Sequence, residues 1–420
     1  MSNLIGTLEH EKLIPSMKKL IPLFLLLATN VWAQQNDYAM TNVNLFNGYE
    51  NKIYPNTIVF VKAGKIERIG KTGDNIASSY VIIDGEGNYL MPGLIDAHTH
   101  IDNLASAKRA LESGVTTVRS ASVSAYQDVS LRELVKSGKL PGPDMVATGV
   151  FVTPKLGETI LADPRLAELY GGVNTAEELR KLVSVNIDRG VNFIKTRGTE
   201  RAGLPDTDPR QQTYTQQQLK VIVDEAAKSN VPVMVHAHGD EGAYAAVMAG
   251  ARSIEHGTFL SERTLKAMKD KGTFLVLTYI TLEDLTKPGG DYDNPVLELR
   301  GRFMMPLAEK VFKKAHALGV KIATGADNDY GPSSTSRIAL EVAHFVRMGM
   351  SNFEAIQSAT TISAELLKLE KQTGRIAPGF EADVILVPAN PLEDVFALQD
   401  VLLVMNNGQL GLKRLPFGKN

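Results

Sequence analysis

The sequence predicts an α/β protein, a (β/α)8 TIM barrel with a small β-sandwich lobe formed by its N- and C-terminal segments. Three observations carry this prediction. Apolar runs alternate with amphipathic segments over residues 91–373, whereas residues 34–90 and 374–420 hold short β-rich runs separated by glycine and asparagine turns. The length of 420 residues leaves room for both a barrel domain and an accessory lobe.

The predicted barrel strands are eight buried-type runs, each followed by a segment with helical character. In order they are LIDAHTH (94–100), TTVRSA (116–121), DMVATG (144–149), NFIKTR (192–197), PVMVHAH (232–238), RSIEHG (252–257), TFLVLTY (273–279) and KIATGAD (321–327). Capping boxes at Thr175, Thr215 and Ser351 mark helix starts. A doubly wound sheet is the alternative, but its first strand normally ends in a glycine-rich turn, and here His-Thr-His stands there.

The lobe is predicted because both ends of the chain contain short β-rich runs separated by turns. Asn407-Gly408 is a strong hairpin signal within the C-terminal segment. In the N-terminal segment, Gly64 to Thr72 is similar to a phosphate-binding loop, yet five residues instead of four separate its glycines. We therefore expect a turn in a basic hairpin there and no nucleotide site.

Residues 1–33 have the layout of a signal peptide, with residues 1–16 as an upstream extension and Met17 as the expected start. Lys18 and Lys19 precede an apolar run at 20–28, and residues 31–33 offer a cleavage site. The run is shorter than the roughly 20 residues that cross a bilayer, so a permanent transmembrane helix is the weaker alternative. The expected location is outside the cytoplasm, periplasmic or secreted, with no stable membrane anchor.

Charge and cysteine content exclude several classes of function. The 45 basic and 47 acidic residues give a formal net charge of −2, which provides no electrostatic footprint for nucleic acid. The chain has no cysteine, so disulfides, thiolate metal sites and cysteine nucleophiles are excluded. Any metal must sit on histidine, carboxylate or modified lysine side chains.

Histidines gather at the predicted strand ends. His98 and His100 close the first strand two residues apart, and a period of two places them on one face. His236 and His256 close the fifth and sixth strands, and His238 shares the face of His236. The carboxyl ends of barrel strands hold active sites, so these residues are candidate metal ligands, with ordinary rim histidines as the alternative. The remaining three histidines, His10, His316 and His344, lie before the signal peptide or on predicted helices.

Lys195 and Asp327 complete the candidate set. Asp327 ends the eighth strand and can ligate a metal and receive a proton, unless it only caps the following helix. Lys195 would point its ammonium into the barrel beside bound dications, which desolvation and charge repulsion disfavour. A neutral amine there can add carbon dioxide to form a carbamate that bridges two ions; a lysine paired with an acid is the alternative.

These residues together resemble the amidohydrolase superfamily in its carboxylated-lysine, binuclear type, close to its prolidase-like and imidazolonepropionase-related members. The resemblance rests on PGLIDAHTH, the strand-four lysine, the strand-five histidine, SIEHG and TGAD, and on Gly374 to Asp383 as the hallmark of the accessory lobe. It implies two divalent ions, zinc by expectation, although imidazoles and carboxylates accept several metals. The implied ligands are His98, His100 and Asp327 for one metal, His236 and His256 for the other, and N6-carboxylated Lys195 as the bridge.

The resemblance also implies a reaction, in which a hydroxide bridging the two ions attacks an amide carbon and Asp327 passes a proton to the leaving nitrogen. The expected substrate is a dipeptide or an N-acyl amino acid. Tyr214 matches the tyrosine that related dipeptidases place near the substrate carbonyl, and Arg197 and His238 are further candidates for substrate contacts. Each of the three can instead be a loop or rim residue.

One departure weakens the dipeptidase interpretation. The third strand is followed by ATGVFVTP, which lacks the histidine that the related dipeptidases carry there. Cyclic amides, ureas, esters and lactones remain alternative substrates for the same machinery. A catalytically inactive barrel that serves as a binding module is a further alternative, and a homo-oligomer stays open.

Overall fold

A computed structural model of the chain describes residues 36–289, 292–334 and 337–416. All described residues belong to one compact unit. The predicted signal peptide therefore lies outside the described residues. Within the described ranges, no helix combines the length and the apolar character that a membrane crossing requires.

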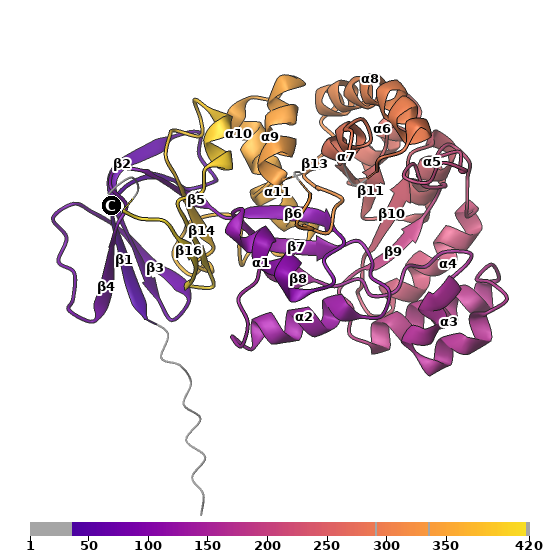
Figure 1. Cartoon of the computed structure of the whole chain (residues 1–420), viewed down its shortest axis with the longest axis horizontal. Coiled ribbons are helices and arrows are strands. Elements are labelled where there is room, and N and C mark those ends of the chain that lie inside the picture. Colours follow the sequence, from indigo (N-terminus) through magenta and orange to yellow (C-terminus); the bar gives the residue numbers. More distant parts are fainter. Residues whose placement is uncertain (1–35, 290–291, 335–336, 417–420) are drawn as a thin grey trace, which may run out of the picture. The chain divides into compact units, whose positions relative to one another are not determined.

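Eight parallel strands coincide with the eight predicted runs and form two sheets, ordered β6-β7-β8 and β13-β12-β11-β10-β9 (Figure 1). All are short and buried on both faces, as their continuous apolar character predicts. Their bounds are β6 (Leu94–Thr99), β7 (Val115–Ser120), β8 (Asp144–Val146), β9 (Ile194–Arg197), β10 (Val233–Ala237), β11 (Ser253–His256), β12 (Phe274–Val276) and β13 (Ile322–Ala323).

The two parallel sheets are linked to each other at both of their edges. On one side, Val152 after β8 forms a parallel bridge with Thr196 of β9. On the other side, Thr99 of β6 forms a parallel bridge with Asn328, which follows β13. The arrangement is a TIM-barrel-like α/β fold, and it brings the carboxyl ends of β8 and β9 together, and likewise those of β13 and β6.

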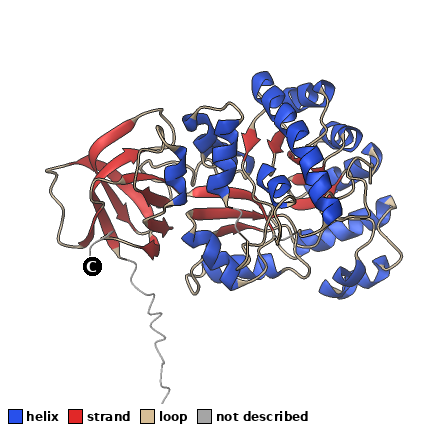
Figure 2. Ribbon diagram, turned by 45° about the horizontal axis from the view of Figure 1, so that its top comes forward, coloured by secondary structure: helices blue, strands red, loops and turns tan. Residues whose placement is uncertain are grey.

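Helices cover the outside of these strands (Figure 2). The capping boxes at Thr175, Thr215 and Ser351 are all formed and begin α3, α4 and α10, which confirms these predicted helix starts. The α-helices are α1 (Leu104–Glu112), α2 (Gln127–Lys136), α3 (Ala176–Asp188), α4 (Gln216–Ala227), α5 (Asp240–Ala249), α6 (Glu262–Lys271), α7 (Tyr279–Asp284), α8 (Pro295–Leu318), α9 (Ile338–Arg347), α10 (Asn352–Ser358) and α11 (Thr361–Leu366). Three 3₁₀ turns complete the set: η1 (Gly157–Ala162), η2 (Pro164–Leu169) and η3 (Val395–Gln399).

The N- and C-terminal segments pair in one mixed sheet of eight strands, ordered β16-β15-β14-β5-β1-β2-β3, with β4 beside β1. Strand β14 joins the two ends of the chain by pairing antiparallel with β5. Asn407 and Gly408 adopt φ of 50° and 71° in the predicted hairpin between β15 and β16. The bounds are β1 (Asp37–Phe46), β2 (Ile53–Lys62), β3 (Lys65–Lys71), β4 (Tyr80–Asp84), β5 (Tyr89–Pro92), β14 (Val384–Val387), β15 (Leu403–Asn406) and β16 (Gln409–Lys413).

The inward face of the parallel strands changes from apolar to polar along each strand. Phe193 and Met234 precede Lys195 and His236 by two residues, share their faces, and are fully buried. Apolar side chains therefore fill the ring of strands toward its amino-terminal side. The polar side chains are left at the carboxyl ends, where barrel enzymes place their active sites.

Candidate metal centre

A cavity of about 520 Å³ lies at the carboxyl ends of the parallel strands. The six predicted metal ligands and His238 all line it. The six come from five different strand ends: His98, His100, Lys195, His236, His256 and Asp327. The structure therefore brings together residues that lie up to 229 positions apart in the sequence.

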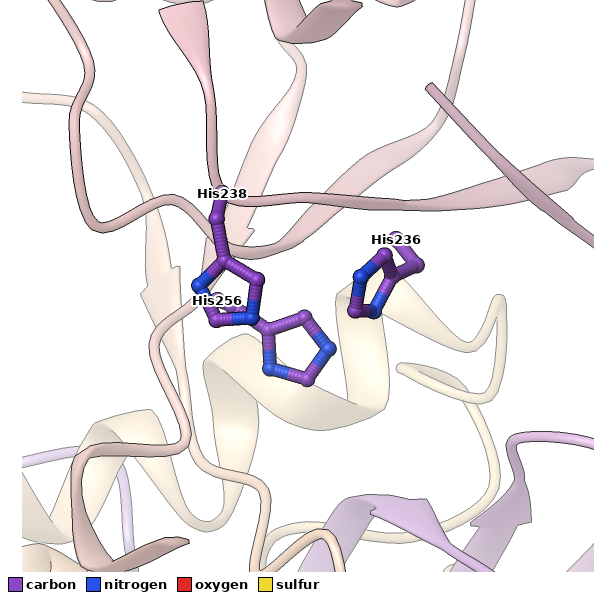
Figure 3. A group of neighbouring side chains, drawn as sticks. All are labelled: His236, His238 and His256. Atoms are coloured by element: carbon purple, nitrogen blue, oxygen red, sulfur yellow. The ribbon is translucent and has the colours of Figure 1, made fainter. Parts of the chain in front are cut away.

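Three imidazoles form a tight cluster on one wall of this cavity. His236, His238 and His256 face one another from the ends of β10 and β11 (Figure 3). One donor atom of each lies within 4.8 Å of the others, and the rings of His238 and His256 are stacked 4.6 Å apart. The sequence predicts only His236 and His256 as ligands here, and the structure adds a third donor.

Asp327 is the meeting point of a second group, formed with His98 and His256, whose donor atoms also lie within 4.8 Å of one another. Its Oδ1 is 3.1 Å from Nε2 of His98 and 3.2 Å from Nε2 of His100. Burial opposes ionisation of Asp327, but the neighbouring imidazoles hold its pKa well below the usual range. An ionised carboxylate among imidazoles is a donor set that fits a divalent cation.

The imidazoles of the cluster are neutral. Burial, reinforced by the neighbouring imidazoles, lowers the pKa of His236 and His256 well below the usual value, and burial lowers that of His238 to about 3. A histidine must be neutral to bind a metal.

Hydrogen bonds to neighbouring protein groups orient four of the rings through Nδ1, which leaves Nε2 available to a metal. The Nδ1 partners are Glu255 for His98, the Ser122 carbonyl for His100, Thr258 for His238 and Thr278 for His256, at 2.7 to 3.0 Å. The exception is His236, whose Nε2 lies 3.1 Å from the carbonyl oxygen of Glu200.

The backbone is left-handed at four residues that line the cavity. The φ angles are 103° at Ser122, 73° at His256, 50° at Thr278 and 49° at Asp327. Residues other than glycine seldom adopt such angles, and those that do gather at functional sites. Glu255 already points to the inward face of β11, so regular alternation would turn the next residue, His256, outward. The left-handed backbone at His256 instead brings its ring into the cavity.

Lys195 is 3% exposed, and its Nζ lies 3.4 Å from Nε2 of His98. Burial lowers its pKa to about 8, although the charges of Glu255 and Asp327 oppose the shift. At pH 7 about a tenth of this amine is therefore neutral, far more than for an exposed lysine.

The sequence analysis missed a buried ion pair behind the cavity. Arg119 and Glu255 are fully buried and 2.9 Å apart, and Glu255 also contacts His98. Burial disfavours the Glu255 carboxylate, but Arg119 and His98 outweigh it and hold the pKa at about 2. Adjacent residues of a strand point to opposite faces. An inward His256, as the predicted metal ligands require, therefore implied an outward Glu255.

Two of the residues predicted to contact substrate do not line the cavity. The Tyr214 hydroxyl is buried and donates to the Val173 carbonyl at 2.7 Å. Arg197 forms an ion pair with Glu200 at 3.0 Å, and its guanidinium carbon lies 5.9 Å from the centre of the Phe151 ring. Their roles toward substrate stay predictions to which this geometry adds no support.

Side chains that the sequence did not single out also line the cavity. After the third strand, where related dipeptidases carry a histidine, Phe151 and Thr153 line the cavity. The cations that line it besides Lys195 are Lys155 and Arg201, and neither was selected from the sequence. Both lie on loops, where residue spacing carries little information about side-chain direction.

Comparisons with known proteins identify the family of this chain. The chain is 29% identical over 355 residues to ochratoxinase from Aspergillus niger, covering 74% of this chain and 72% of the ochratoxinase. It is 26% identical to imidazolonepropionase from Colwellia psychrerythraea, covering 83% and 90%. The crystal structure of a Xaa-Pro dipeptidase with bound methionine in the active site superimposes with a TM-score of 0.80 at 28% identity, covering 89% of this chain and 99% of the dipeptidase. The model of the amidohydrolase family matches residues 89–411, well over half of the 420 residues, and this chain therefore belongs to that family of hydrolases.

Proposed function

We propose that this protein is a binuclear metal-dependent hydrolase that cleaves the amide bond of a dipeptide or an N-acyl amino acid. The observation that carries the proposal is the pair of donor groups in one cavity, His236-His238-His256 and His98-His256-Asp327. The similarity to a Xaa-Pro dipeptidase and to ochratoxinase supports this substrate class.

In this proposal His98, His100 and Asp327 hold one divalent ion, zinc by expectation, and His236 and His256 hold the other. Ions bound there lower the pKa of water and polarise the scissile carbonyl, which supplies the nucleophile and stabilises the developing oxyanion. The neutral state of the buried imidazoles and the ionised state of Asp327 support this assignment of ligands.

We propose that Lys195 bridges the two ions as an N6-carboxylate. Its neutral amine attacks carbon dioxide: a nitrogen–carbon bond forms, one carbon–oxygen π bond breaks with its electron pair moving to oxygen, and the nitrogen gives one proton to water. The near-complete burial of Lys195 and its lowered pKa support this step, because only the unprotonated amine is nucleophilic.

Asp327 is the proposed proton carrier. Its side chain is 14% exposed and lies between the imidazoles of His98 and His100, so it faces the space that the substrate enters. It takes a proton from the attacking water and donates it to the leaving nitrogen, which departs as a neutral amine.

We also propose that the eight parallel strands form a closed (β/α)8 barrel and that the mixed sheet is an accessory β-sandwich lobe. The bridges Val152–Thr196 and Thr99–Asn328 support closure. For location we propose export by the predicted signal peptide. Mass spectrometry of the mature N-terminus in a fractionated host tests export, and a cytoplasmic protein that begins at Met1 would contradict it.

The test of function is elemental analysis beside activity on dipeptides, N-acyl amino acids, cyclic amides, ureas and lactones. The variants are Lys195→Ala and, as a matched control, Lys220→Ala on the exposed face of α4. We expect close to two metal equivalents per chain in the wild type and in the control, and loss of metal and of amide cleavage in Lys195→Ala. Metal content near one or zero, or activity indifferent to Lys195, would contradict the binuclear proposal.

The same panel decides between substrate classes. Cleavage confined to cyclic amides would favour the alternative that the imidazolonepropionase similarity supports. No cleavage of any class by the metal-loaded wild type would favour a binding module, although every predicted ligand position is filled and lines the cavity.

A further inference from the structure

The cavity has a cationic side that the metal centre does not use. Lys155 and Arg201 line the cavity with exposed side chains, and within the described residues neither forms an ion pair. Lys155 follows β8 and Arg201 follows β9, whose carboxyl ends lie side by side through the Val152–Thr196 bridge. Two uncompensated positive charges therefore stand at one sector of the cavity wall.

The acidic side chains of the cavity lie in a different sector. Asp102 and Asp329 also line it and follow β6 and β13, which are joined by the Thr99–Asn328 bridge. These strand ends are separated from β8 and β9 by β7 on one side and by β10, β11 and β12 on the other. Apart from the metal centre, a substrate in the cavity thus meets positively charged side chains in one sector only.

The loop that carries Arg201 is held in place by α8. The Arg300 guanidinium donates hydrogen bonds to four backbone carbonyls of this loop, those of Ala202, Leu204, Pro205 and Thr207. The same loop is pinned at its base by a bridge between Thr199 and Gln212. Its backbone is therefore fixed while the Arg201 side chain remains free to contact a ligand.

Arg197 is a poorer anion receptor than Arg201. Its charge is compensated by Glu200 at 3.0 Å, and it lies outside the cavity lining. An incoming carboxylate would have to displace Glu200, whereas at Arg201 no such competition exists.

We propose that Arg201 and Lys155 form the subsite that binds the free carboxylate of the substrate, so that the enzyme selects amides whose leaving amine is an amino acid. Leu156, Leu282 and Leu285 also line the cavity and offer apolar contacts to the uncharged part of the same substrate. This inference rests on the proposed amide hydrolase function and assigns the groups that confer its specificity. Arg300 is a positioning residue in this subsite, since it contacts the loop and not the cavity.

The first test is binding, which needs no turnover. Calorimetry with L-leucine and L-leucinamide compares a ligand with and without a carboxylate on the metal-loaded protein. We expect the wild type to bind L-leucine at least about tenfold more tightly, and Arg201→Gln to lose most of this preference, because a hydrogen-bonded charge pair contributes about tenfold to hundredfold. Lys155→Gln should lose part of it, and Arg201→Lys should retain part.

The second test is kinetic and uses glycyl-L-leucine and glycyl-L-leucinamide. Arg201→Gln should raise KM for the dipeptide about tenfold to hundredfold and change KM for its amide by less than about threefold. Arg302→Gln is the matched control, since Arg302 is exposed on α8 and pairs with Glu298. Thermal denaturation of each variant confirms that the fold is retained.

The outcomes separate the two proposals. Equal wild-type affinity for leucine and its amide, or a preference that survives in Arg201→Gln and Lys155→Gln, overturns the subsite. A preference lost only in Arg197→Gln overturns it in favour of Arg197. If the preference for L-leucine depends on Arg201 but no dipeptide or N-acyl amino acid is cleaved, the subsite stands and the proposed reaction is refuted. If these substrates are cleaved but the carboxylate makes no difference to binding, the reaction stands and the subsite is refuted.

Discussion

Glu255 accepts a hydrogen bond from Nδ1 of His98 at 2.7 Å, and neither side chain is reached by solvent. The bond fixes the ring so that Nε2 faces Asp327 at 3.1 Å. Arg119 holds the other side of the carboxylate, donating to both of its oxygens. A carboxylate that orients a histidine in this way raises its basicity as a metal ligand, and such partners affect metal affinity almost as strongly as the ligands do.

Glu255→Gln should therefore weaken metal binding about tenfold to hundredfold without touching the donor atoms. The variant should also unfold more easily, by about 3–5 kcal/mol, because buried Arg119 loses the carboxylate with which it pairs. Chelator competition measures the affinity, and calorimetry of the metal-free protein measures the stability.

Asp163→Asn is the matched control for Glu255. Asp163 is buried and forms ion pairs with Arg165 and Arg189, yet it does not line the cavity. Its replacement should reduce stability and leave the metal affinity unchanged. Equal loss of affinity in both variants would show that the effect of Glu255 is a general consequence of destabilisation.

Tyr214→Phe tests whether the Tyr214 hydroxyl contacts substrate, as the sequence predicts, or only forms the internal hydrogen bond that the structure shows. The hydroxyl donates to the carbonyl of Val173 inside the protein, so its removal leaves a buried acceptor unpaired. We expect a loss of about 1–2 kcal/mol in the free energy of unfolding and no selective change in kcat. A fall in kcat of tenfold or more at unchanged stability would restore Tyr214 to the substrate site.

Arg300→Gln should loosen the loop that carries Arg201, because four carbonyl acceptors lose their donor. We expect KM for the dipeptide substrate to rise about tenfold while kcat and metal content change little. Arg302→Gln, two residues away on the exposed face of α8, is the control. A change confined to kcat would argue against a role in holding the substrate subsite.

The strands and the gathering of the candidate ligands at their ends were predictable because each leaves a local signal. The eight strands are apolar runs that must be buried on both faces, and the histidines sit where such runs end. The three capping boxes likewise fix helix starts through contacts within four residues.

The rest depends on contacts between distant parts of the chain. Glu255 meets His98 across 157 residues, and Arg300 orders a loop about 95 residues away. The left-handed turn at His256 breaks the alternation on which sequence reasoning relies. Strand parity singled out Arg197 but says nothing about Arg201, which lies on the loop that begins after β9.

The carboxylates Asp383 and Asp144, which lie between the barrel strands and the mixed sheet, should make the stability of the protein vary with pH. Asp383 is 2% exposed and accepts a hydrogen bond from the backbone of Asn407, which also donates through its side chain to Asp144. Burial, reinforced by the charge of Asp144, raises the pKa of Asp383 to about 8. The folded protein therefore keeps a proton on Asp383 that the unfolded chain, with a pKa of about 3.9, releases.

Because the folded state binds more protons between about pH 4 and pH 8, the free energy of unfolding should fall as pH rises through this window, by up to about 1.4 kcal/mol per pH unit. Asp383→Asn carries no titrating proton, so the variant should lose less stability than the wild type between pH 5.5 and 8.5. Urea titrations at several pH values measure both slopes, with exposed Asp270→Asn on α6 as the control. Parallel profiles for the wild type and Asp383→Asn would mean that Asp383 is ionised in the folded protein, and that Asn407 and the surrounding backbone stabilise its charge.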